Sequence, residues 1–489
     1  MQPAGNLSKK LFSGLFWVLL LNLLVKPIWI LGIEVGVQNA VGAEAYGLYF
    51  TLFNLAYIFN ILLDLGITNF NTRNIARHPQ LLGKHLSGIL SIKLLLLLFY
   101  AVITLTVGLL LGFSSRQFGL LALLCLNQFL NSLILYLRSN FEGLLLFRWD
   151  SVLSVLDRVL MIAICGGLLY LSHHSETTFR IEWFVYAQTA AYAITAAIAL
   201  TVLLRRTSLR RLHWNRAFAL LIIKRSAPFA LLVLLMASYN RIDPILLSML
   251  SPSGDTASGI YASAFRLLDA LTMIAYLVSV PLLPVYARLT HDNSGHEELR
   301  TVTQSTFSLL MVFAATSAIT LSAIASPLMQ LLYTSHISES AEVFRILIFG
   351  IIPLSFTYIF GTLLTAGGQL RQLNILALST LIINIATNLL LIPRYGALGS
   401  AWASLISQSF MALSQTVVAL RIYHLRPSYA YIAKLALFGI IICLANMICS
   451  HLCISWWGQA LAALGTTCIA AVLLRLIDIK RLMDLATNR

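Results

Sequence analysis

Long apolar stretches follow one another along the whole chain, separated by short polar segments, and this pattern predicts a helical membrane protein. A bilayer core about 30 Å thick needs roughly 20 apolar residues in a helix. By that measure the sequence predicts eight transmembrane helices near 11–36, 47–70, 87–112, 118–138, 150–171, 182–204, 219–250 and 257–286. It predicts six more near 302–332, 343–366, 371–392, 396–421, 429–450 and 457–478. The expected fold class is therefore an all-α integral membrane protein with about fourteen transmembrane helices.

The first apolar stretch is predicted to be a membrane span and not a signal peptide. Lys9 and Lys10 precede it, and it continues from Leu11 to about Val35. This length exceeds the apolar region of a signal peptide, and no small-residue cleavage site follows.

Composition supports the membrane interpretation and excludes a soluble protein. Apolar residues make up 59% of the chain and charged residues 10%, with a mean hydropathy of +0.86. An ordinary soluble domain carries roughly a quarter charged residues. The net charge of +15 does not indicate nucleic-acid binding, because the basic residues lie in loops and at helix ends and form no basic domain with interleaved aromatics. Membrane lipids are the expected surroundings, and nucleic acid is not an expected partner.

The basic residues also predict the orientation in the membrane. If both termini are cytoplasmic, only three arginines fall in the outside loops: Arg116, Arg180 and Arg394. The basic residues placed inside include Arg73, Arg77, Lys84, Arg138, Arg148, Arg205, Arg206, Arg210, Arg211, Arg216, Arg288, Arg300, Arg371, Arg421, Arg426, Arg475, Lys480, Arg481 and Arg489. This asymmetry follows the positive-inside rule, so a multi-pass protein with both termini in the cytoplasm is expected.

Motifs of enzymatic chemistry are absent from the sequence. It contains no phosphate-binding G-x-x-x-x-G-K-[ST] loop, no nucleophile elbow and no HExxH. The six cysteines are scattered, and packing is the favoured role for Cys449 and Cys453, which are four residues apart. We therefore expect no catalytic residues, no metal and no cofactor, and a transporter instead of an enzyme.

An internal repeat predicts how the helices are grouped. Gly47-Leu-Tyr49-x-x-x-Phe53-x-Leu55 opens the second predicted helix, and Gly259-Ile-Tyr261-x-x-x-Phe265-x-Leu267 opens the eighth, about 212 residues later. Six helices separate the motifs, so the repeats share one orientation, a known transporter design with a site between the repeats. We expect two pseudo-symmetric six-helix lobes, residues 1–210 and 211–425, followed by two extra helices and a cytoplasmic tail in 426–489.

Charged residues inside predicted helices are the candidate functional positions, because each costs about 2.5–3.5 kcal/mol or more at a helix centre. Lys26 lies near the middle of the first helix, before Pro27, and shares a face with Asn22 and Trp29. This stripe indicates a cavity lining, and the alternative is a lysine paired with an acid such as Asp64 for packing. Three further cations near helix ends are expected to snorkel to the interface: Lys93, Arg345 and Lys434.

Other helices carry further candidates. Asp64 belongs to a polar stripe with Tyr57, Asn60 and Thr68, and Arg241 and Asp243 follow Asn240 in the seventh helix. Arg266 and Asp269 are three apart, so they form either a structural salt bridge or a cargo contact. Asp157 and Arg158 are adjacent and point to different sides. If protons drive transport, we expect Asp64, Asp243 or Asp269 to carry them. Polar faces of the kind that join helices include Thr380, Asn384, Asn388, Ser400, Ser404 and Gln408.

Two sequence blocks resemble a known transporter superfamily. The late block carries Gly368 with Arg371, Asn384 with Asn388, and Ile392-Pro393-x-Tyr395-Gly396-x-x-Gly399-x-Ala401. The early block carries Gly42-x-Glu44-x-Tyr46-Gly47-Leu-Tyr49 and then Asp64-Leu-Gly66, and Arg241-Ile-Asp243 is a further shared feature. The chain resembles the polysaccharide-transporter branch of the multidrug/oligosaccharidyl-lipid/polysaccharide exporter superfamily.

The resemblance implies two lobes in a V around a central cavity, alternating access, and residence in a bacterial inner membrane. It implies a flippase that moves undecaprenyl-diphosphate-linked oligosaccharide for O-antigen, capsule or exopolysaccharide synthesis, with a polysaccharide polymerase of the same pathway as a further partner. Its cationic cavity would hold the cargo through Lys26, Arg158, Arg241 and Arg266, because a desolvated diphosphate needs cations nearby. No fixed family motif covers Arg158 or Arg266.

Three alternatives remain open at this level. A drug or metabolite antiporter of the same superfamily is the main one, although drug exporters typically have twelve helices and acidic cavities. A peptidoglycan-precursor flippase would have the same fold. A polymerase or glycosyltransferase would need a large extracytoplasmic loop, and the predicted outside loops are short.

Overall fold

The computed structural model describes residues 21–22, 24–78, 80, 82–174, 177–205, 207, 216–291, 296–425, 429–452 and 455–476. These residues are almost entirely helical and include no strand. The predicted fold class, an all-helical integral membrane protein, is confirmed. Lys9, Lys10 and residues 11–20 and 23 of the predicted span 11–36 lie outside the described residues, as does the tail from residue 477 onward.

The chain forms two compact units, Met1–Ser248 (unit 1) and Met249–Arg489 (unit 2). The predicted boundaries 1–210, 211–425 and 426–489 stay a prediction. The described elements of unit 1 are the π-helix η1 (Ile28–Glu34), α2 (Val35–Ile58), the 3₁₀-helix η2 (Phe59–Leu63), α3 (Ile67–Arg77), α4 (Leu82–Leu110), α5 (Ser115–Gly143), α6 (Phe147–His174), α7 (Ile181–Leu204), α8 (Arg216–Arg241) and α9 (Asp243–Leu250), which ends just past the boundary.

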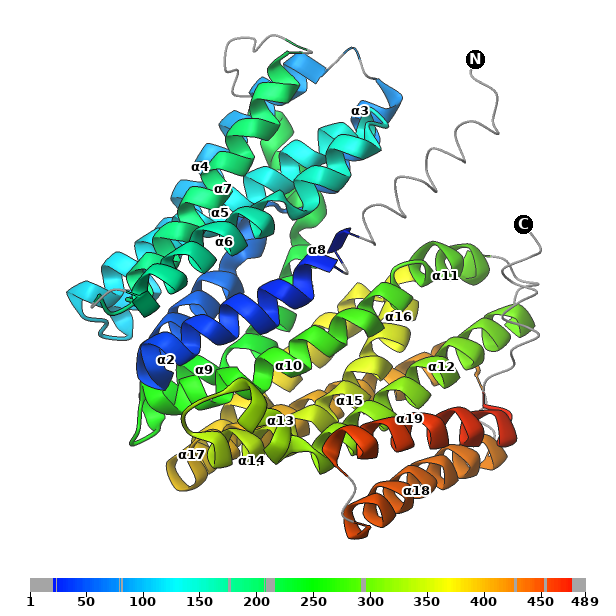
Figure 1. The fold of residues 1–489 in the computed structure, drawn as a ribbon. Coiled ribbons are helices and arrows are strands. Elements are labelled where there is room, and N and C mark those ends of the chain that lie inside the picture. Colours follow the sequence, from blue (N-terminus) through cyan, green and yellow to red (C-terminus); the bar gives the residue numbers. More distant parts are fainter. Residues whose placement is uncertain are drawn as a thin grey trace. The chain divides into compact units, whose positions relative to one another are not determined.

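Unit 2 contains the remaining elements (Figure 1). They are α10 (Asp255–Ser279), α11 (Leu282–His291), α12 (His296–Ala323), α13 (Ala325–Leu332), α14 (Ile337–Leu347), η4 (Ile348–Gly350), α15 (Ile351–Phe356), the π-helix η5 (Thr357–Gly361), α16 (Thr362–Ala366), α17 (Leu370–Ile422), α18 (Tyr429–His451) and α19 (Trp456–Leu473).

Eleven helices of the described residues are long and apolar enough to cross a membrane, or twelve when α8 and α9, bent by 44°, count as one span. Two of the eleven are too long for one crossing, since Leu24–Leu63 has 40 residues and Leu370–Ile422 has 53, and a helix rises about 1.5 Å per residue. Each breaks at a glycine with a positive φ, Gly42 at 83° and Gly396 at 54°. When the halves of these two helices are counted separately, the twelve spans become fourteen segments. Agreement with the predicted number of about fourteen transmembrane helices depends on this division.

The break at Gly42 belongs to the internal repeat. Gly254, 212 residues later, also has a positive φ, 51°, and each glycine precedes a long helix that contains the repeated motif. The motif's aromatic rings stack alike in both copies: the Tyr49 and Phe53 centroids are 5.8 Å apart, and so are those of Tyr261 and Phe265. The repeat therefore extends from sequence to backbone conformation and side-chain packing. The φ/ψ values of both glycines lie in a region that is essentially restricted to glycine.

In unit 1, α4, α5, α6 and α7 run side by side and α2 packs against α5, α7 and α8 (Figure 1). The short helix α3 lies against the end of α5, where a Cβ on Gly143 would come within 2.9 Å of Ile75 Cβ. Glycine at this position therefore permits the close approach.

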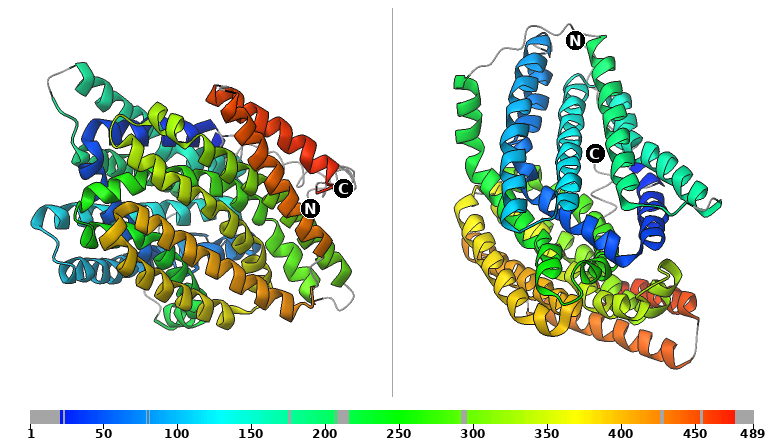
Figure 2. Two further views of the ribbon diagram at one scale, coloured as in Figure 1. Left: turned by 90° about the horizontal axis from the view of Figure 1, so that it is seen from below. Right: turned by 90° about the vertical axis from the view of Figure 1, so that its left-hand side faces the viewer.

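In unit 2, α18 and α19 form a pair next to α12 (Figure 2). Phe438 and Ile442 of α18 share an apolar cluster with Val312 of α12 and residues of α19. Asn446 Nδ2 donates a hydrogen bond of 3.4 Å to Thr320 Oγ1. The two final helices are thus joined to unit 2 by both apolar and polar contacts.

Candidate functional site

Arg158 of α6 lies among aromatic groups of two other helical segments and beside an acidic group of its own helix. Its guanidinium carbon is 5.4 Å from the centre of the Trp29 ring and 6.0 Å from that of Tyr192. Its Nη1 donates to Tyr192 Oη at 3.4 Å, and its Nε lies 3.7 Å from Asp157 Oδ2. The Arg158 side chain is 29% exposed. Arg158 is therefore a partly neutralised cation held between two aromatic rings.

From Trp29, a continuous series of aromatic contacts crosses unit 1. Trp29 stacks on Phe184 at 5.9 Å, and Phe184 meets Tyr49 edge to face at 5.1 Å. Tyr49 stacks on Phe53 at 5.8 Å, and Phe53 on Tyr57 at 6.1 Å. We call these five residues the aromatic ladder. Three helical segments contribute to it: η1 with Trp29, α7 with Phe184, and α2 with the rest.

Arg241 stands at the other end of the aromatic ladder. Its guanidinium carbon lies 5.0 Å from the centre of the Tyr57 ring. Trp29, Phe184 and Tyr49 are buried, whereas Tyr57 is 38% exposed and Arg241 is half-buried. Arg158, 29% exposed, thus lies at the end of the ladder whose rings are buried, and Arg241 lies at the end where Tyr57 is accessible.

The π-helix η1 positions the first step of the ladder. Pro27 follows Lys26 in the sequence, and the structure places the π-helix Ile28–Glu34 directly after this proline. A π-helix bonds i to i+5, so residues five apart lie along one side. Trp29 Nε1 accordingly donates to Glu34 Oε1 at 3.0 Å. This bond fixes the indole against Phe184, and π-helical turns occur frequently at functional sites.

Lys26 is half-buried one turn before Trp29. The face predicted for it also carries Asn22, whose Nδ2 donates to Ser154 Oγ of α6 at 3.2 Å. Asn22 and Trp29 both meet α6, at Ser154 and Arg158, which are four residues apart. Lys26 belongs to a helix segment that faces α6 on either side of it.

Asp64 is paired with Lys93 of α4, at 3.0 Å from Nζ to Oδ1. The expectation that Lys93 snorkels to the interface is wrong, because its side chain is 1% exposed. Lys93 lies six residues into the predicted span 87–112, which suggested a helix end. In the structure its ammonium group instead binds oxygens of Leu63 and Asp64, at the break that precedes α3. Arg345 and Lys434 are exposed.

Asp243 is the first residue of α9 and is fully buried. Negative charge at a helix N-terminus is stabilised by the helix dipole. Thr51 Oγ1 of α2 donates a hydrogen bond of 3.2 Å to the carbonyl oxygen of Pro244, the residue that follows Asp243. The bend between Arg241 and Asp243 is thereby attached to the helix that carries most of the aromatic ladder.

Arg266 lies in unit 2 and is buried there. Its Nη1 donates to Tyr333 Oη at 2.7 Å, and Tyr333 Oη donates to the Ser263 carbonyl at 3.3 Å. Asp269, three residues on, is exposed. Arg266 is thus anchored by a tyrosine 67 positions away in sequence, which helical spacing alone did not reveal.

The polar face of α17 joins the two halves of that helix. Asn384 Nδ2 donates to Ser407 Oγ at 3.1 Å, across the break at Gly396. Gln408 Nε2 donates to Ser404 Oγ at 3.1 Å. The first of these contacts fits the expected role in helix association, whereas the second joins residues four apart within one half of α17.

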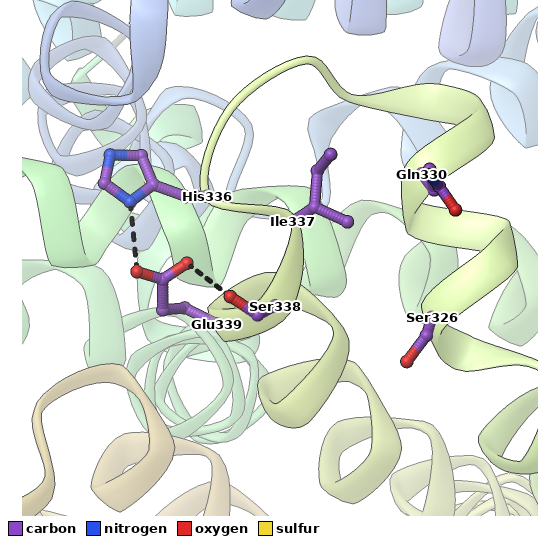
Figure 3. Close-up of a pocket in the computed structure, with 6 residues that line it drawn as sticks. All are labelled: Ser326, Gln330, His336, Ile337, Ser338 and Glu339. Carbon is purple, nitrogen blue, oxygen red and sulfur yellow. Dashed lines mark hydrogen bonds and ion pairs between the residues drawn. The ribbon is translucent and has the colours of Figure 1, made fainter.

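A separate shallow hollow of about 450 Å³ is formed by α13 and the start of α14 (Figure 3). His336 Nδ1 lies 3.4 Å from Glu339 Oε1, and Ser338 Oγ donates to Glu339 Oε2 at 3.3 Å. None of the predicted site residues lines this hollow.

The sequence interpretation missed Phe184 and Tyr192 as site members. Both lie on one face of α7, together with Gln188, at positions i, i+4 and i+8. Gln188 Nε2 donates to Tyr192 Oη at 3.4 Å. The regular spacing of this aromatic and polar face was the signal that could have indicated them.

Comparison with known proteins identifies the family. The sequence model of the polysaccharide biosynthesis protein family matches residues 11–290, which is more than half of the chain. The chain belongs to this family. A sequence search of curated proteins finds no match.

Solved structures share the fold of this family member at low sequence identity. The lipid II flippase MurJ, in an inward closed conformation, is 14% identical with a TM-score of 0.69, covering 94% of this chain and 99% of that chain. A multidrug resistance MATE family transporter of the MOP superfamily, in an inward-facing conformation, is 15% identical with a TM-score of 0.65, covering 81% and 94%. A MOP superfamily transporter from Pyrococcus furiosus is 16% identical with a TM-score of 0.55, covering 86% and 96%. The resemblance found in the sequence is confirmed, and the fold is that of MOP superfamily transporters.

Proposed function

We propose that this protein is a flippase, not an enzyme, which moves undecaprenyl-diphosphate-linked oligosaccharide units from the cytoplasmic to the periplasmic leaflet of a bacterial inner membrane. The reaction serves synthesis of a cell-surface polysaccharide such as O-antigen, capsule or exopolysaccharide, and proceeds by alternating access. Membership of the polysaccharide biosynthesis family supports the pathway. The observation that carries the assignment to this chain is the aromatic ladder with Arg158 and Arg241 at its ends.

The chemistry of the cargo matches the accessible end of the ladder. A lipid-linked oligosaccharide joins a diphosphate anion to sugar rings with polarised C–H groups. Arg241 presents a planar, permanently charged fork suited to phosphate oxygens. Phe53 and Tyr57 offer ring faces with negative partial charge, to which C–H groups are attracted. A diphosphate on Arg241 would therefore have its first sugars beside Tyr57.

The remaining cations are assigned different parts. Lys26 is half-buried one turn before Trp29, and we assign it to cargo binding at the Trp29 end of the ladder. Arg158 already lies close to Asp157 and Tyr192 and orders the ladder at its Trp29 end. Arg266, held by Tyr333 in unit 2, supplies a second cationic position.

The acidic residues divide in the same way. Asp64 is paired with Lys93, and Asp243 and Asp269 are the other candidates if a proton gradient drives transport. The polymerase of the same pathway remains an expected partner, and membrane lipids surround the protein.

A drug or metabolite antiporter is the second candidate, because MATE transporters share the fold. The similar MATE structure covers 81% of this chain and the MurJ structure 94%, so the chain matches the longer architecture better. Arginines along the candidate site also disfavour cationic drugs. A flippase for a peptidoglycan precursor would share these features and differ only in its sugars.

The test is deletion of the gene, with measurement of surface polysaccharide and of drug sensitivity. We expect loss of the surface polysaccharide and accumulation of its lipid-linked unit on the cytoplasmic leaflet. Normal polysaccharide with increased sensitivity to cationic drugs would support the antiporter instead.

A further inference from the structure

The Lys93 ammonium lies inside unit 1 in a group of four oxygens, which we call the Lys93 cage. Nζ is 3.0 Å from the Leu63 carbonyl, 3.0 Å from Asp64 Oδ1, 3.2 Å from the Ser132 carbonyl and 2.7 Å from Ser132 Oγ. The ring face of Tyr136 lies beneath it, with its centroid 5.9 Å from Nζ. An ion surrounded in this way has exchanged its hydration shell for protein oxygens.

The cage exists because the second span is interrupted. The 3₁₀-helix η2 ends at Leu63, and Leu65 and Gly66 have φ values of 45° and 79° before α3 begins. Such a break frees backbone carbonyls, which in a membrane must be satisfied internally. Ser132 Oγ also donates to the Leu63 carbonyl at 3.3 Å. Unwound backbone carbonyls coordinate monovalent cations in interrupted membrane helices, and here the Leu63 carbonyl at the break lies beside the Asp64 carboxylate.

We propose that the Lys93 cage is a monovalent-cation site that the chain fills with its own ammonium group. One carboxylate, two carbonyls and a hydroxyl provide one negative charge for one positive charge. Buried charges of this kind persist when they are paired and hydrogen-bonded, and here the side chain of α4 brings the cation permanently. The occupant cannot dissociate, so no Na⁺ or K⁺ is exchanged at this position during transport.

Removal of the lysine side chain should uncover the site. In Lys93→Ala the cage retains its oxygens and gains room for an ion. In Lys93→Met the side chain retains most of its volume but brings no charge, so this variant is the matched control. Both residues favour helices, so neither change perturbs α4 through its backbone.

The experiment measures the thermal unfolding midpoint of the full-length protein in nanodiscs, in chloride salts of Na⁺, K⁺, methylammonium or N-methyl-D-glucamine. We expect the midpoint of Lys93→Ala to rise with the concentration of at least one of the first three cations, as ligand linkage requires. N-methyl-D-glucamine is too large to enter and should have no effect. The wild type and Lys93→Met should not respond to any of the cations beyond the common effect of ionic strength.

A second substitution tests the cage itself. Ser132→Ala in the Lys93→Ala background removes one oxygen and should raise the half-maximal cation concentration about tenfold, the effect of losing one hydrogen-bonding or coordinating group. The proposal would be overturned if Lys93→Ala folds and its thermal unfolding midpoint does not change with the concentration of Na⁺, K⁺ or methylammonium. Failure of Lys93→Ala to accumulate in cells would overturn it too, because the K⁺ of the cytoplasm should fill the cage.

Discussion

The guanidinium carbon of Arg241 lies 5.0 Å from the centre of the Tyr57 ring, so the last residue of α8 caps the aromatic series of α2. The bend between α8 and α9 follows immediately, and Thr51 of α2 is bonded to Pro244 beyond it. The Arg241 guanidinium is thus positioned by α8 and α2, the two helices that form the accessible end of the ladder. In the proposed flippase, cargo bound at Arg241 would therefore be coupled to the geometry of this bend.

Substitutions at Arg241 should separate charge from shape. Arg241→Ala is expected to reduce export of the lipid-linked unit about tenfold or more, since a hydrogen bond to a charged group is worth about 1.5–3 kcal/mol. Arg241→Lys keeps the charge without the planar fork and should fall between Ala and wild type. Transport rates normalised to the amount of protein in the membrane provide the measurement, and equal rates for all three proteins would remove Arg241 from the site.

Tyr57 tests the role of the exposed ring. Tyr57→Leu should lower transport roughly two- to thirtyfold, the range of a cation–π contact worth about 0.5–2 kcal/mol, whereas Tyr57→Phe should retain most activity because the ring face remains. The same normalised transport assay applies. A loss in Tyr57→Phe equal to that in Tyr57→Leu would show that the hydroxyl matters and the ring does not.

Lys26 is expected to act through its charge alone. Lys26→Ala should impair export without loss of protein from the membrane, and Lys26→Arg should restore it largely. Membrane abundance and surface polysaccharide are measured in parallel. Wild-type export by both Lys26→Ala and Arg241→Ala would refute the assignment of cargo binding to these cations.

The Asp64–Lys93 pair is predicted to serve stability. Asp64→Asn leaves a buried ammonium without its counter-charge, at a cost of up to about 3–5 kcal/mol, reduced because Asp64 is 26% exposed. A lower thermal unfolding midpoint, with an unchanged pH dependence of transport in the protein that folds, is the expected result. Transport that loses its pH dependence at normal stability would instead make Asp64 a coupling residue.

Gly42 should be required for its backbone conformation. Its φ of 83° and ψ of 168° place Gly42→Ala in a region that costs other residues about 1–3 kcal/mol. Gly119→Ala in α5 is the control, because its added Cβ meets no atom within 4 Å and its backbone is helical. Thermal unfolding should show a loss for Gly42→Ala only, and an equal response of the two variants would contradict the role given to the break.

The all-helical membrane fold could be predicted from the sequence, because the lengths of the apolar stretches indicate the spans and the basic loops indicate their orientation. The aromatic repeat was accessible as well, through Tyr49 and Tyr261 and their matching neighbours. The breaks at Gly42 and Gly396 fall at boundaries between predicted spans, the first between 11–36 and 47–70 and the second between 371–392 and 396–421. The interruption at residues 64–66 was not predicted, because it lies within the apolar run 47–70 and becomes visible only through the positive φ values of Leu65 and Gly66.

Side-chain partners were the least predictable part of the site. Lys93 was misjudged because its nearest oxygens belong to residues 63, 64 and 132, on other elements. Arg266 finds Tyr333 in the same way, across 67 positions. Helical spacing reports which residues share a face, whereas contacts between helices depend on packing and on backbone breaks that a single sequence does not encode locally.

Translocation of a lipid-linked oligosaccharide by the purified protein tests the central claim most directly. Proteoliposomes would carry an undecaprenyl-diphosphate-linked oligosaccharide with a labelled sugar, and an impermeant reagent that oxidises sugars would report the fraction in the outer leaflet over time. Fast equilibration between leaflets with wild-type protein, and slow equilibration with Arg241→Ala or without protein, is the predicted result. Equilibration no faster than in protein-free liposomes, by a protein that expels cationic drugs from the same vesicles, would contradict the flippase account.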